Sequence, residues 1–292
     1  MRMEHLVTAA EDGRRLRDVL RQVMQVSYTQ MKSAKWDGRI LVDGQPRTVD
    51  QPVRAGETVI FLPAETAPAY RPKPCFRPVP VAWEDEHLLI IDKPAPLASQ
   101  SSARQPDDTL ENMVCAYFGQ PEGFVYRPVN RLDKGTSGLM AVAKTAHAQQ
   151  LMQRMLHTPQ FTRRYLAVVE GAPEPLCGRI DLPIAKDAAA SIRRVITPDG
   201  KPSVTHYETL RQGARSLVRL TLETGRTHQI RVHMSALGHP VCGDFLYGTE
   251  LAALPGWFAL HSAEIDLIHP VTGEGLHIES PLPEELARLL EV

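Results

Sequence analysis

The chain has 292 residues, of which 43% are hydrophobic and 23% are charged, with a formal net charge of −1. This composition is typical of an ordinary soluble globular protein, the length suggests about two domains, and no apolar run reaches the roughly 20 residues of a membrane span. The N-terminus lacks the apolar core of a signal peptide and the four cysteines are scattered without a C-x-x-C pair, so we expect a cytoplasmic protein.

The first sixty residues have the pattern of two short helices followed by a strand hairpin. Residues 14–24 place apolar side chains at helical spacing and leave arginines on the other face, and residues 28–36 form a second helical pattern. A strand at residues 39–42 ends at Asp43-Gly44, a dipeptide that tolerates the positive φ angles of a tight hairpin turn. We therefore expect a small α/β domain at residues 1–62.

A proline-rich linker follows this domain. Residues 63–80 contain six prolines, which cannot donate backbone hydrogen bonds to a sheet. We expect this segment to connect the first domain to a larger second domain at residues 81–292.

The second domain mixes strands and helices. The predicted strands are at residues 81–83, 88–92, 138–144, 164–170, 204–210, 216–223, 229–234 and 276–280. The predicted helices are at residues 108–118, 145–157 and 284–290. Because regular β-α-β units with a glycine-rich phosphate loop are missing, a doubly wound nucleotide-binding fold is disfavoured and the α+β class is favoured.

The small net charge conceals a strong segregation of charge. Lys and Arg outnumber acids by eight to three in residues 14–47, by seven to one in residues 126–165 and by eight to three in residues 193–231. The tail at residues 249–292 has eight acids and one arginine. A fold that gathers the basic segments would present a phosphate-binding face, whereas the simpler alternative is solvated charge spread over the surface.

The one acid within residues 126–165 is Asp133, in the run N-R-L-D-K-G-T-S-G at residues 130–138. Cations around a carboxylate favour its charged form, in which it can act as a nucleophile or a base. The structural alternative is that Asp133 caps a helix or forms an ion pair with Arg131.

A second run favours the chemical interpretation. Residues 224–248 read T-G-R-T-H-Q-I-R-V-H-M-S-A-L-G-H-P-V-C-G-D-F-L-Y-G, and residues 164–171 read R-Y-L-A-V-V-E-G. With the run at residues 130–138, these segments resemble the RluA family of pseudouridine synthases, which has the patterns R-L-D-x-x-T-S-G, T-G-R-T-H-Q-I-R-V-H and G-H-P-x-x-G-D-x-x-Y-G in this order. The resemblance covers about residues 78–290.

The resemblance implies the pseudouridine synthase fold, a bent, mixed and mostly antiparallel sheet with flanking helices. It also implies an isomerase that breaks the C1′–N1 bond of a uridine in RNA, rotates the uracil and rejoins it through C5. This reaction needs no redox change and no external energy, so we expect no cofactor and no metal. Ribosomal RNA is the favoured substrate, transfer RNA is an alternative, and we expect no obligate protein partner.

The family pattern assigns roles to particular side chains. It makes Asp133 the catalytic carboxylate, and leaves open whether Asp133 attacks C1′, adds to the pyrimidine ring or removes a sugar proton. Tyr165 matches the active-site aromatic that stacks on the base and helps to move a proton, and Arg226 matches the basic partner of the catalytic carboxylate. Ile230 corresponds to an aliphatic wall beneath the base, although core packing explains it equally well.

Further cations are expected to contact RNA. A stacked uridine must be flipped out of the RNA at a cost of roughly a few kcal/mol, and Arg131 could fill the space that it leaves. Arg231 is expected on the same RNA-binding surface. The first domain resembles the S4 RNA-binding module, in which Arg17, Lys32 and Lys35 would contact RNA, and a generic helical cap is the alternative.

Two positions depart from the family pattern. Asn130 replaces the usual histidine and cannot titrate near neutral pH, so we expect no proton transfer there. Pro96 replaces a usual glycine at the edge of the cleft.

Two other functions remain as alternatives: a noncatalytic RNA-binding or ribosome-assembly protein, and a hydrolase of glycosidic bonds.

Overall fold

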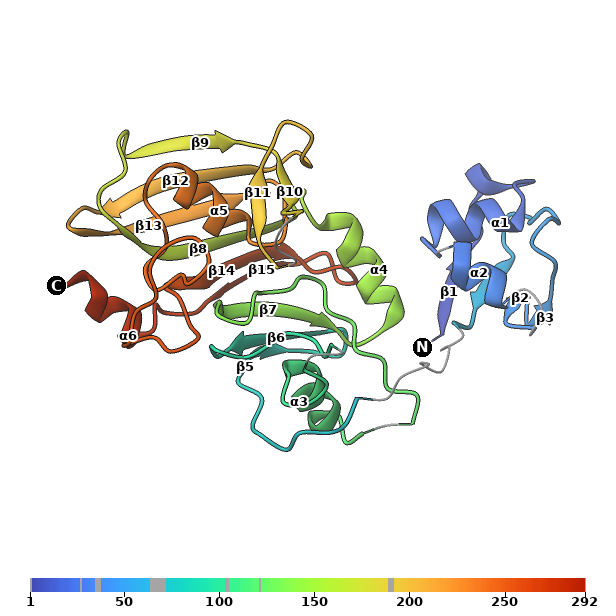
Figure 1. Cartoon of the computed structure of the whole chain (residues 1–292). Helices are drawn as coiled ribbons and strands as arrows, with labels where there is room; N and C mark the ends of the chain where they lie inside the picture. Colours follow the sequence, from blue (N-terminus) through green and yellow to red (C-terminus); the bar gives the residue numbers. More distant parts are fainter. Residues whose placement is uncertain are drawn as a thin grey trace. The chain divides into compact units, whose positions relative to one another are not determined.

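Figure 1 shows the computed structural model of the chain, which describes residues 2–26, 28–34, 38–63, 72–102, 105–120, 122–188 and 192–291. The chain divides into two compact units, residues 1–69 and 70–292. Residues 64–71 of the expected linker lie outside the described residues. From residue 72 on, the chain packs on the second unit, where the Cys75 N–H donates to the carbonyl of Asn112.

The first unit is a four-stranded antiparallel sheet, in the order β1-β4-β2-β3, with a helical segment packed on it. Its elements are β1 (Met3–Leu6), α1 (Leu16–Asp18), a π-helical turn (Val19–Val23), α2 (Tyr28–Ala34), β2 (Ile40–Val42), β3 (Gln45–Pro46) and β4 (Thr58–Phe61). Leu16, Leu20 and Phe61 are fully buried in its core. The helix expected at residues 14–24 is therefore an α-helical turn followed by a π-helical one.

The second unit, which contains the predicted catalytic residues, has fifteen further labelled elements. They are β5 (Val81–Glu84), β6 (Leu88–Lys93), α3 (Leu110–Tyr117), β7 (Ser137–Ala143), α4 (Ala146–Met155), β8 (Phe161–Glu170), β9 (Cys177–Asp181), β10 (Ile184–Lys186), β11 (Arg194–Ile196), β12 (Val204–Arg211), β13 (Arg215–Leu222), α5 (Gln229–Ala236), β14 (Leu260–Ile268), β15 (Gly275–Glu279) and α6 (Glu284–Ala287).

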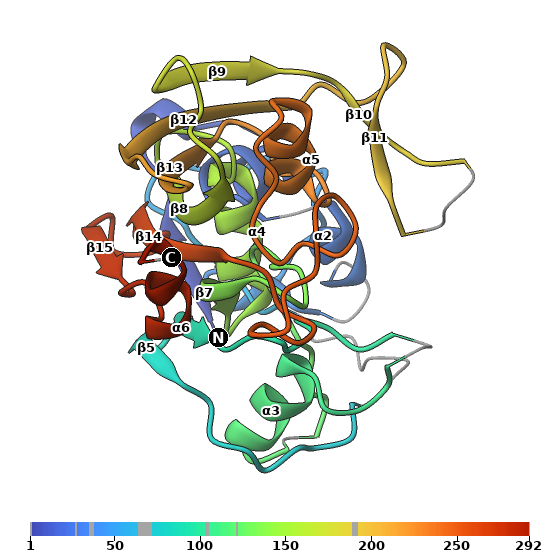
Figure 2. The same ribbon diagram turned by 60° about the vertical axis from the view of Figure 1, so that its left-hand side comes forward.

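One large sheet organises the second unit. It has nine strands in the order β5-β6-β7-β14-β8-β13-β12-β9, with β15 paired to β14. Only the β7–β14 pair is parallel among these strands, so the predicted α+β fold with a mixed, mostly antiparallel sheet is confirmed. The β10–β11 hairpin is separate and projects from one end of this unit (Figure 2). No helix of the described segments is long and apolar enough to cross a membrane.

The strands beside the site are apolar on both faces because both faces are covered. On β6, Leu89 and Ile91 pack in the core that contains α3, while Leu88 and Ile90 pack in the core that contains α4. All four side chains are fully buried. This double burial explains the unbroken apolar run and fixes the sheet from which the loop that carries Asp133 emerges.

Several sequence-based assignments differ from the structure, and strands β1, β9, β10 and β11 have no counterpart among the predicted elements. The strand predicted at residues 229–234 is wrong, because these residues form α5. Polar and apolar side chains alternate here, but the polar ones do not face solvent, because every residue from Gln229 to Met234 is buried. Strand β14 was not predicted, although Ala263, Ile265 and Leu267 alternate with acids as a half-buried strand should.

Gly138 allows β7 and β14 to approach closely. Its φ angle is +100°, and a Cβ atom there would overlap the backbone of Ser262. We expect Gly138→Ala to lower the free energy of unfolding by about 3 kcal/mol or more, because both strain and backbone overlap oppose it. Urea denaturation measures the change. Gly275→Ala, where a Cβ atom meets nothing within 4 Å, should change stability by no more than about 0.5 kcal/mol. Equal effects of the two substitutions would contradict this account.

Candidate active site

A pocket of about 660 Å³ opens where the loop before β7 faces β8 and the start of α5. Six residues that the sequence predicted as functional line it: Arg131, Asp133, Tyr165, Arg226, Ile230 and Arg231. Residues from three distant segments of the chain therefore meet in one cavity, as the family resemblance implied.

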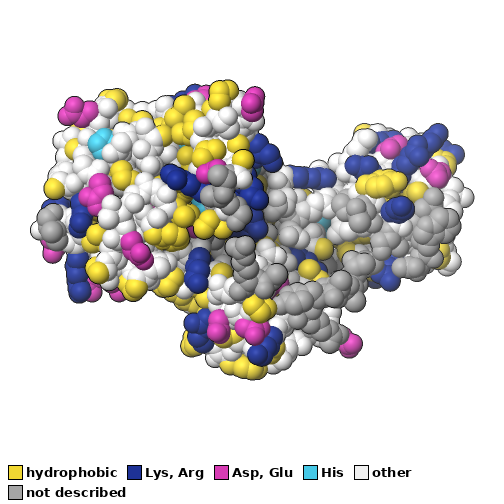
Figure 3. Space-filling model, viewed as in Figure 1, with side chains coloured by type: hydrophobic (Ala, Val, Ile, Leu, Met, Phe, Trp, Pro, Cys, Tyr) yellow, Lys and Arg dark blue, Asp and Glu magenta, His cyan; other side chains and the backbone are white. Residues whose placement is uncertain are grey.

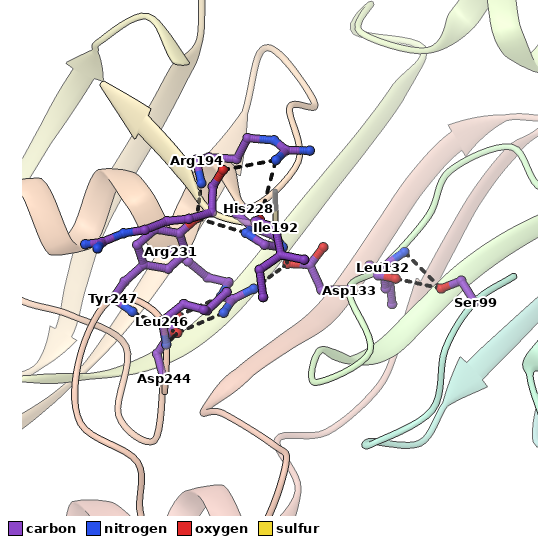
Figure 4. Close-up of polar contacts among 11 residues, drawn as sticks. Ser99, Leu132, Asp133, Ile192, Arg194, His228, Arg231, Asp244, Leu246 and Tyr247 are labelled. Atoms are coloured by element: carbon purple, nitrogen blue, oxygen red, sulfur yellow. Dashed lines mark hydrogen bonds and ion pairs between the residues drawn. The ribbon is translucent and has the colours of Figure 1, made fainter. Parts of the chain in front are cut away.

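Asp133 is held at the pocket wall by one strong partner. Its Oδ2 atom accepts a hydrogen bond from Arg231 Nη1 at 3.1 Å, and His228 Nε2 lies 3.8 Å from the same oxygen (Figure 4). Within the described part of the chain, no hydrogen bond involves the other oxygen, Oδ1. The side chain is 26% exposed. One oxygen is thus anchored while the other is available to a molecule in the pocket.

Arg231 is itself fixed by a second carboxylate. Its Nε and Nη2 atoms donate to the two oxygens of Asp244 at 2.6 and 2.8 Å, in the bidentate geometry that suits arginine. The guanidinium also lies over the ring of Phe258, 4.1 Å from its centre. Asp244 is fully buried and the Arg231 side chain is 3% exposed, so the position of Arg231 is rigidly determined.

The start of α5 places Arg231 and lines the pocket. His228 precedes the helix in the left-handed conformation, with φ of +59°. The next residue, Gln229, accepts from the Arg226 N–H and donates to the carbonyl of Val204, which ties the turn to β12. Burial lowers the pKa of His228, against the opposing effect of Asp133, so its imidazole is neutral near pH 7.

The prediction that Arg226 is the partner of Asp133 is wrong. The Nε atom of Arg226 donates to the carbonyl of Pro202 at 3.2 Å, and the carboxylate is paired with Arg231 instead. Arg226 is exposed at the pocket rim, whereas Arg231 is buried. The chain turns through His228 between the two residues, and this turn decides which guanidinium reaches the carboxylate.

Tyr165 and Ile230 form apolar walls of the pocket. Both are 4% exposed, and both also belong to the main core cluster. No hydrogen bond of the described residues involves the Tyr165 hydroxyl. Each of the two side chains therefore packs in the core and also presents a surface to the cavity.

The loop that carries Asp133 is supported from behind by residues 93–99. The buried ammonium of Lys93 donates to the carbonyls of Leu97 and Pro94 at 2.8 and 3.1 Å. The Ser99 hydroxyl donates to the carbonyl of Leu132, next to Asp133. Burial lowers the pKa of Lys93 to about 7, although the charge of Asp133 opposes this shift.

The two departures from the family pattern lie beside this loop. Asn130 is buried and its Oδ1 atom accepts from the Ala141 N–H at 2.9 Å, so it braces β7. The Ala95–Pro96 peptide bond is cis.

The cations expected to bind RNA in the first unit are less well defined. Arg17 is half-buried and its Nη1 atom donates to Asp50 at 2.9 Å. Lys32 is exposed on α2. Lys35 lies outside the described residues.

Several site residues had no assigned role in the sequence-based prediction. Asp244 and Tyr247 both occur in the G-D-x-x-Y-G run, and Lys93 is the last residue of the apolar strand β6. The Tyr247 hydroxyl lies 2.9 Å from Nδ1 of His228. An acid and an aromatic at fixed positions in a long motif were the available signal, but their partners become visible only in three dimensions.

Comparison with known proteins shows the family of the chain. The family model described as RNA pseudouridylate synthase matches residues 87–236. The chain is 37% identical over 259 residues to the uncharacterized RNA pseudouridine synthase YjbO of Bacillus subtilis, covering 87% of this chain and 90% of that protein. It is 38% identical over 300 residues to ribosomal large subunit pseudouridine synthase D of Xanthomonas campestris, covering 95% of this chain and 88% of that protein.

A solved structure shows the same fold. The human RNA pseudouridylate synthase domain containing 1 superimposes with a TM-score of 0.58 at 24% identity, covering 74% of this chain and 95% of that one. The chain belongs to the RNA pseudouridylate synthase family. The prediction of an isomerase that acts on RNA is thereby confirmed.

Lys93 should make stability depend on pH. The pKa of Lys93 is about 7 in the folded state, and its ordinary value is 10.5. In the pH window between these two values, Lys93 loses its proton only when the chain is folded. The unfolded state then binds more protons, so stability rises with pH through the window. Between pH 7 and 9, we expect the wild type to gain about 2–3 kcal/mol relative to Lys93→Met. Urea denaturation at both pH values measures this gain. A difference in unfolding free energy between wild type and Lys93→Met that is the same at pH 7 and pH 9 would contradict the account.

Removal of the Asp244 carboxylate should leave the buried guanidinium of Arg231 with only the partly exposed Asp133 as a charged partner. We expect Asp244→Asn to lower the free energy of unfolding by about 3–5 kcal/mol, because Arg231 loses its charged partner within the core. Asp266→Asn is the matched control, since Asp266 is 36% exposed and pairs with Arg164 at the surface. The control should lower stability by less than about 1 kcal/mol. Chemical denaturation that gave equal losses would show that Arg231 does not depend on Asp244.

Proposed function

We propose that the protein isomerises specific uridines in structured RNA to pseudouridine, that Asp133 is the catalytic carboxylate, and that ribosomal RNA is the substrate. The observation that carries this proposal is the Asp133–Arg231–Asp244 arrangement at the wall of a pocket. It supplies a carboxylate with one oxygen held by Arg231 and the other oxygen without a hydrogen bond from the described residues.

The reaction is balanced without any added group. The C1′–N1 bond breaks, the uracil turns within the pocket, a C1′–C5 bond forms, and the proton on C5 is lost while N1 gains one. A carboxylate beside the sugar and base can attack C1′, add to the ring or remove a sugar proton, and each use requires its charged form. Arg231 fixes the direction of this carboxylate.

The other pocket residues suit the handling of a free base. Tyr165 offers a flat ring for stacking and a hydroxyl without a described protein partner, which can pass a proton. Ile230 closes the apolar side of the cavity. Arg131 neighbours Asp133 in sequence and lines the same pocket, so it can occupy the place of the flipped uridine in the RNA stack.

The surface beside the pocket suits an RNA backbone. Lys and Arg side chains gather around the β10–β11 hairpin and beside α4 (Figure 3). A second depression of about 480 Å³ shares Arg226 with the pocket, and Lys186, Arg194 and Lys201 also line it. Such a surface binds phosphates with little regard to sequence. In the first unit, an S4-like domain at residues 1–62, the exposed Lys32 would add a contact outside the catalytic unit.

Ribosomal RNA is favoured because the relative in Xanthomonas campestris is named as a ribosomal large subunit pseudouridine synthase and matches 95% of this chain. Such a substrate places the protein in the cytoplasm.

The decisive variant is Asp133→Asn, which keeps the shape of the side chain and removes its charge. In cells that lack the protein, we expect wild type to restore a modified uridine in ribosomal RNA and Asp133→Asn to restore none. Carbodiimide treatment followed by primer extension maps the modified position, and a release assay for free uracil detects hydrolysis instead of isomerisation. Restoration of the same uridine by both proteins would refute the role of Asp133. A site found only in transfer RNA would refute the substrate.

A further inference from the structure

Arg163 is a buried cation without a protein partner. It lies on β8, two residues before Tyr165, and is 6% exposed. None of the hydrogen bonds or ion pairs among the described residues involves its guanidinium, and its Nε atom is buried without a partner. The guanidinium lies over the ring of Phe161 at 5.4 Å and lines the pocket.

This isolation is unusual for an arginine inside a protein. A buried charge is normally paired, because the loss of hydration is unfavourable unless other groups replace the water. The neighbouring Arg164 pairs with Glu264 and Asp266, and Arg231 pairs with two aspartates. The one acid that lines the pocket, Asp133, is held by Arg231. The missing counter-charge of Arg163 must therefore come from outside the described chain.

Two further groups surround the same part of the pocket. A Cβ atom on Gly225 would lie 2.9 Å from Cε1 of His157 and 3.8 Å from Nη2 of Arg163, so the glycine leaves space between these side chains. Burial lowers the pKa of His157, and the charges of Arg163 and Arg226 lower it further. Three nitrogen-bearing side chains thus converge there, and no acid of the pocket lining other than Asp133 balances them.

We propose that Arg163, together with Arg226 and His157, binds a phosphodiester next to the flipped uridine. Arg163 and Tyr165 point to the same side of β8 and are about 7 Å apart along the strand. This separation suits a nucleotide with its base beside Tyr165 and its phosphate beside Arg163. The inference deepens the proposed function and rests on it, because it assigns the RNA backbone to the pocket that contains Asp133.

The test measures binding of a short single-stranded RNA with one uridine, at several salt concentrations, to wild type, Arg163→Gln and Arg164→Gln. Arg164→Gln is the matched control, because it removes one positive charge from the adjacent position on the same strand. We expect Arg163→Gln to weaken binding about tenfold or more at low salt. A plot of log K against log salt has a negative slope. The magnitude of this slope should decrease by about 0.7, the value for one phosphate of a single strand. The control should bind like wild type.

A neutral linkage locates the phosphate. A methylphosphonate placed on the 5′ or the 3′ side of the uridine should make wild type and Arg163→Gln bind equally at one of the two positions. A tenfold difference that persists with both modified RNAs would overturn the proposal, as would an Arg163→Gln variant that binds like the control.

Two measurements distinguish phosphate binding by Arg163 from a purely structural role of its side chain. The melting temperature of Arg163→Gln should equal or exceed that of wild type, because an unpaired buried charge is removed. A lower melting temperature with unchanged RNA binding would mean that Arg163 has a structural role. Binding requires no turnover, so an active Asp133→Asn variant would refute the catalytic assignment and leave this result to stand by itself.

Discussion

The site depends on one buried guanidinium that joins two carboxylates. Arg231 is fixed by Asp244 through two hydrogen bonds and reaches Asp133 with its remaining nitrogen. The inner carboxylate and the ring of Phe258 remove the freedom that an arginine side chain normally has. The direction of the Asp133 carboxylate is thereby set by a buried side chain of the core. A carboxylate positioned in this way needs little reorganisation when a substrate arrives.

Three buried cations around the pocket show three ways of balancing a charge. Arg231 has two carboxylates, Lys93 has backbone carbonyls from residues 94–97, and Arg163 has no described protein partner. Arg231 donates to Asp133 itself, and Lys93 lies 3.5 Å from the carbonyl of the next residue, Lys134. The third favours folding least, as expected of a group for which we propose an RNA phosphate as the partner.

The sequence predicted the elements in which the spacing of apolar residues follows the buried faces. It predicted the residues of the pocket from long sequence motifs. Strands such as β6 and β8 were found because their apolar patterns reflect the two covered faces of the sheet. Helix α5 was mistaken for a strand because all of its sides are buried, so alternation carried no information. The choice between Arg226 and Arg231 depended on the left-handed turn at His228. The roles of Asp244 and Arg163 depend on contacts, and contacts cannot be deduced from one sequence.

The most direct test compares the single-turnover rates of Arg231→Gln and Arg226→Gln on ribosomal RNA from cells that lack the protein, with enzyme in saturating excess. If Arg231 directs the carboxylate, its variant should bind RNA but react about a hundredfold more slowly or worse. Arg226→Gln should bind more weakly and, once saturated, react at the wild-type rate. A fast Arg231→Gln enzyme, or a slow and fully saturated Arg226→Gln enzyme, would contradict the account.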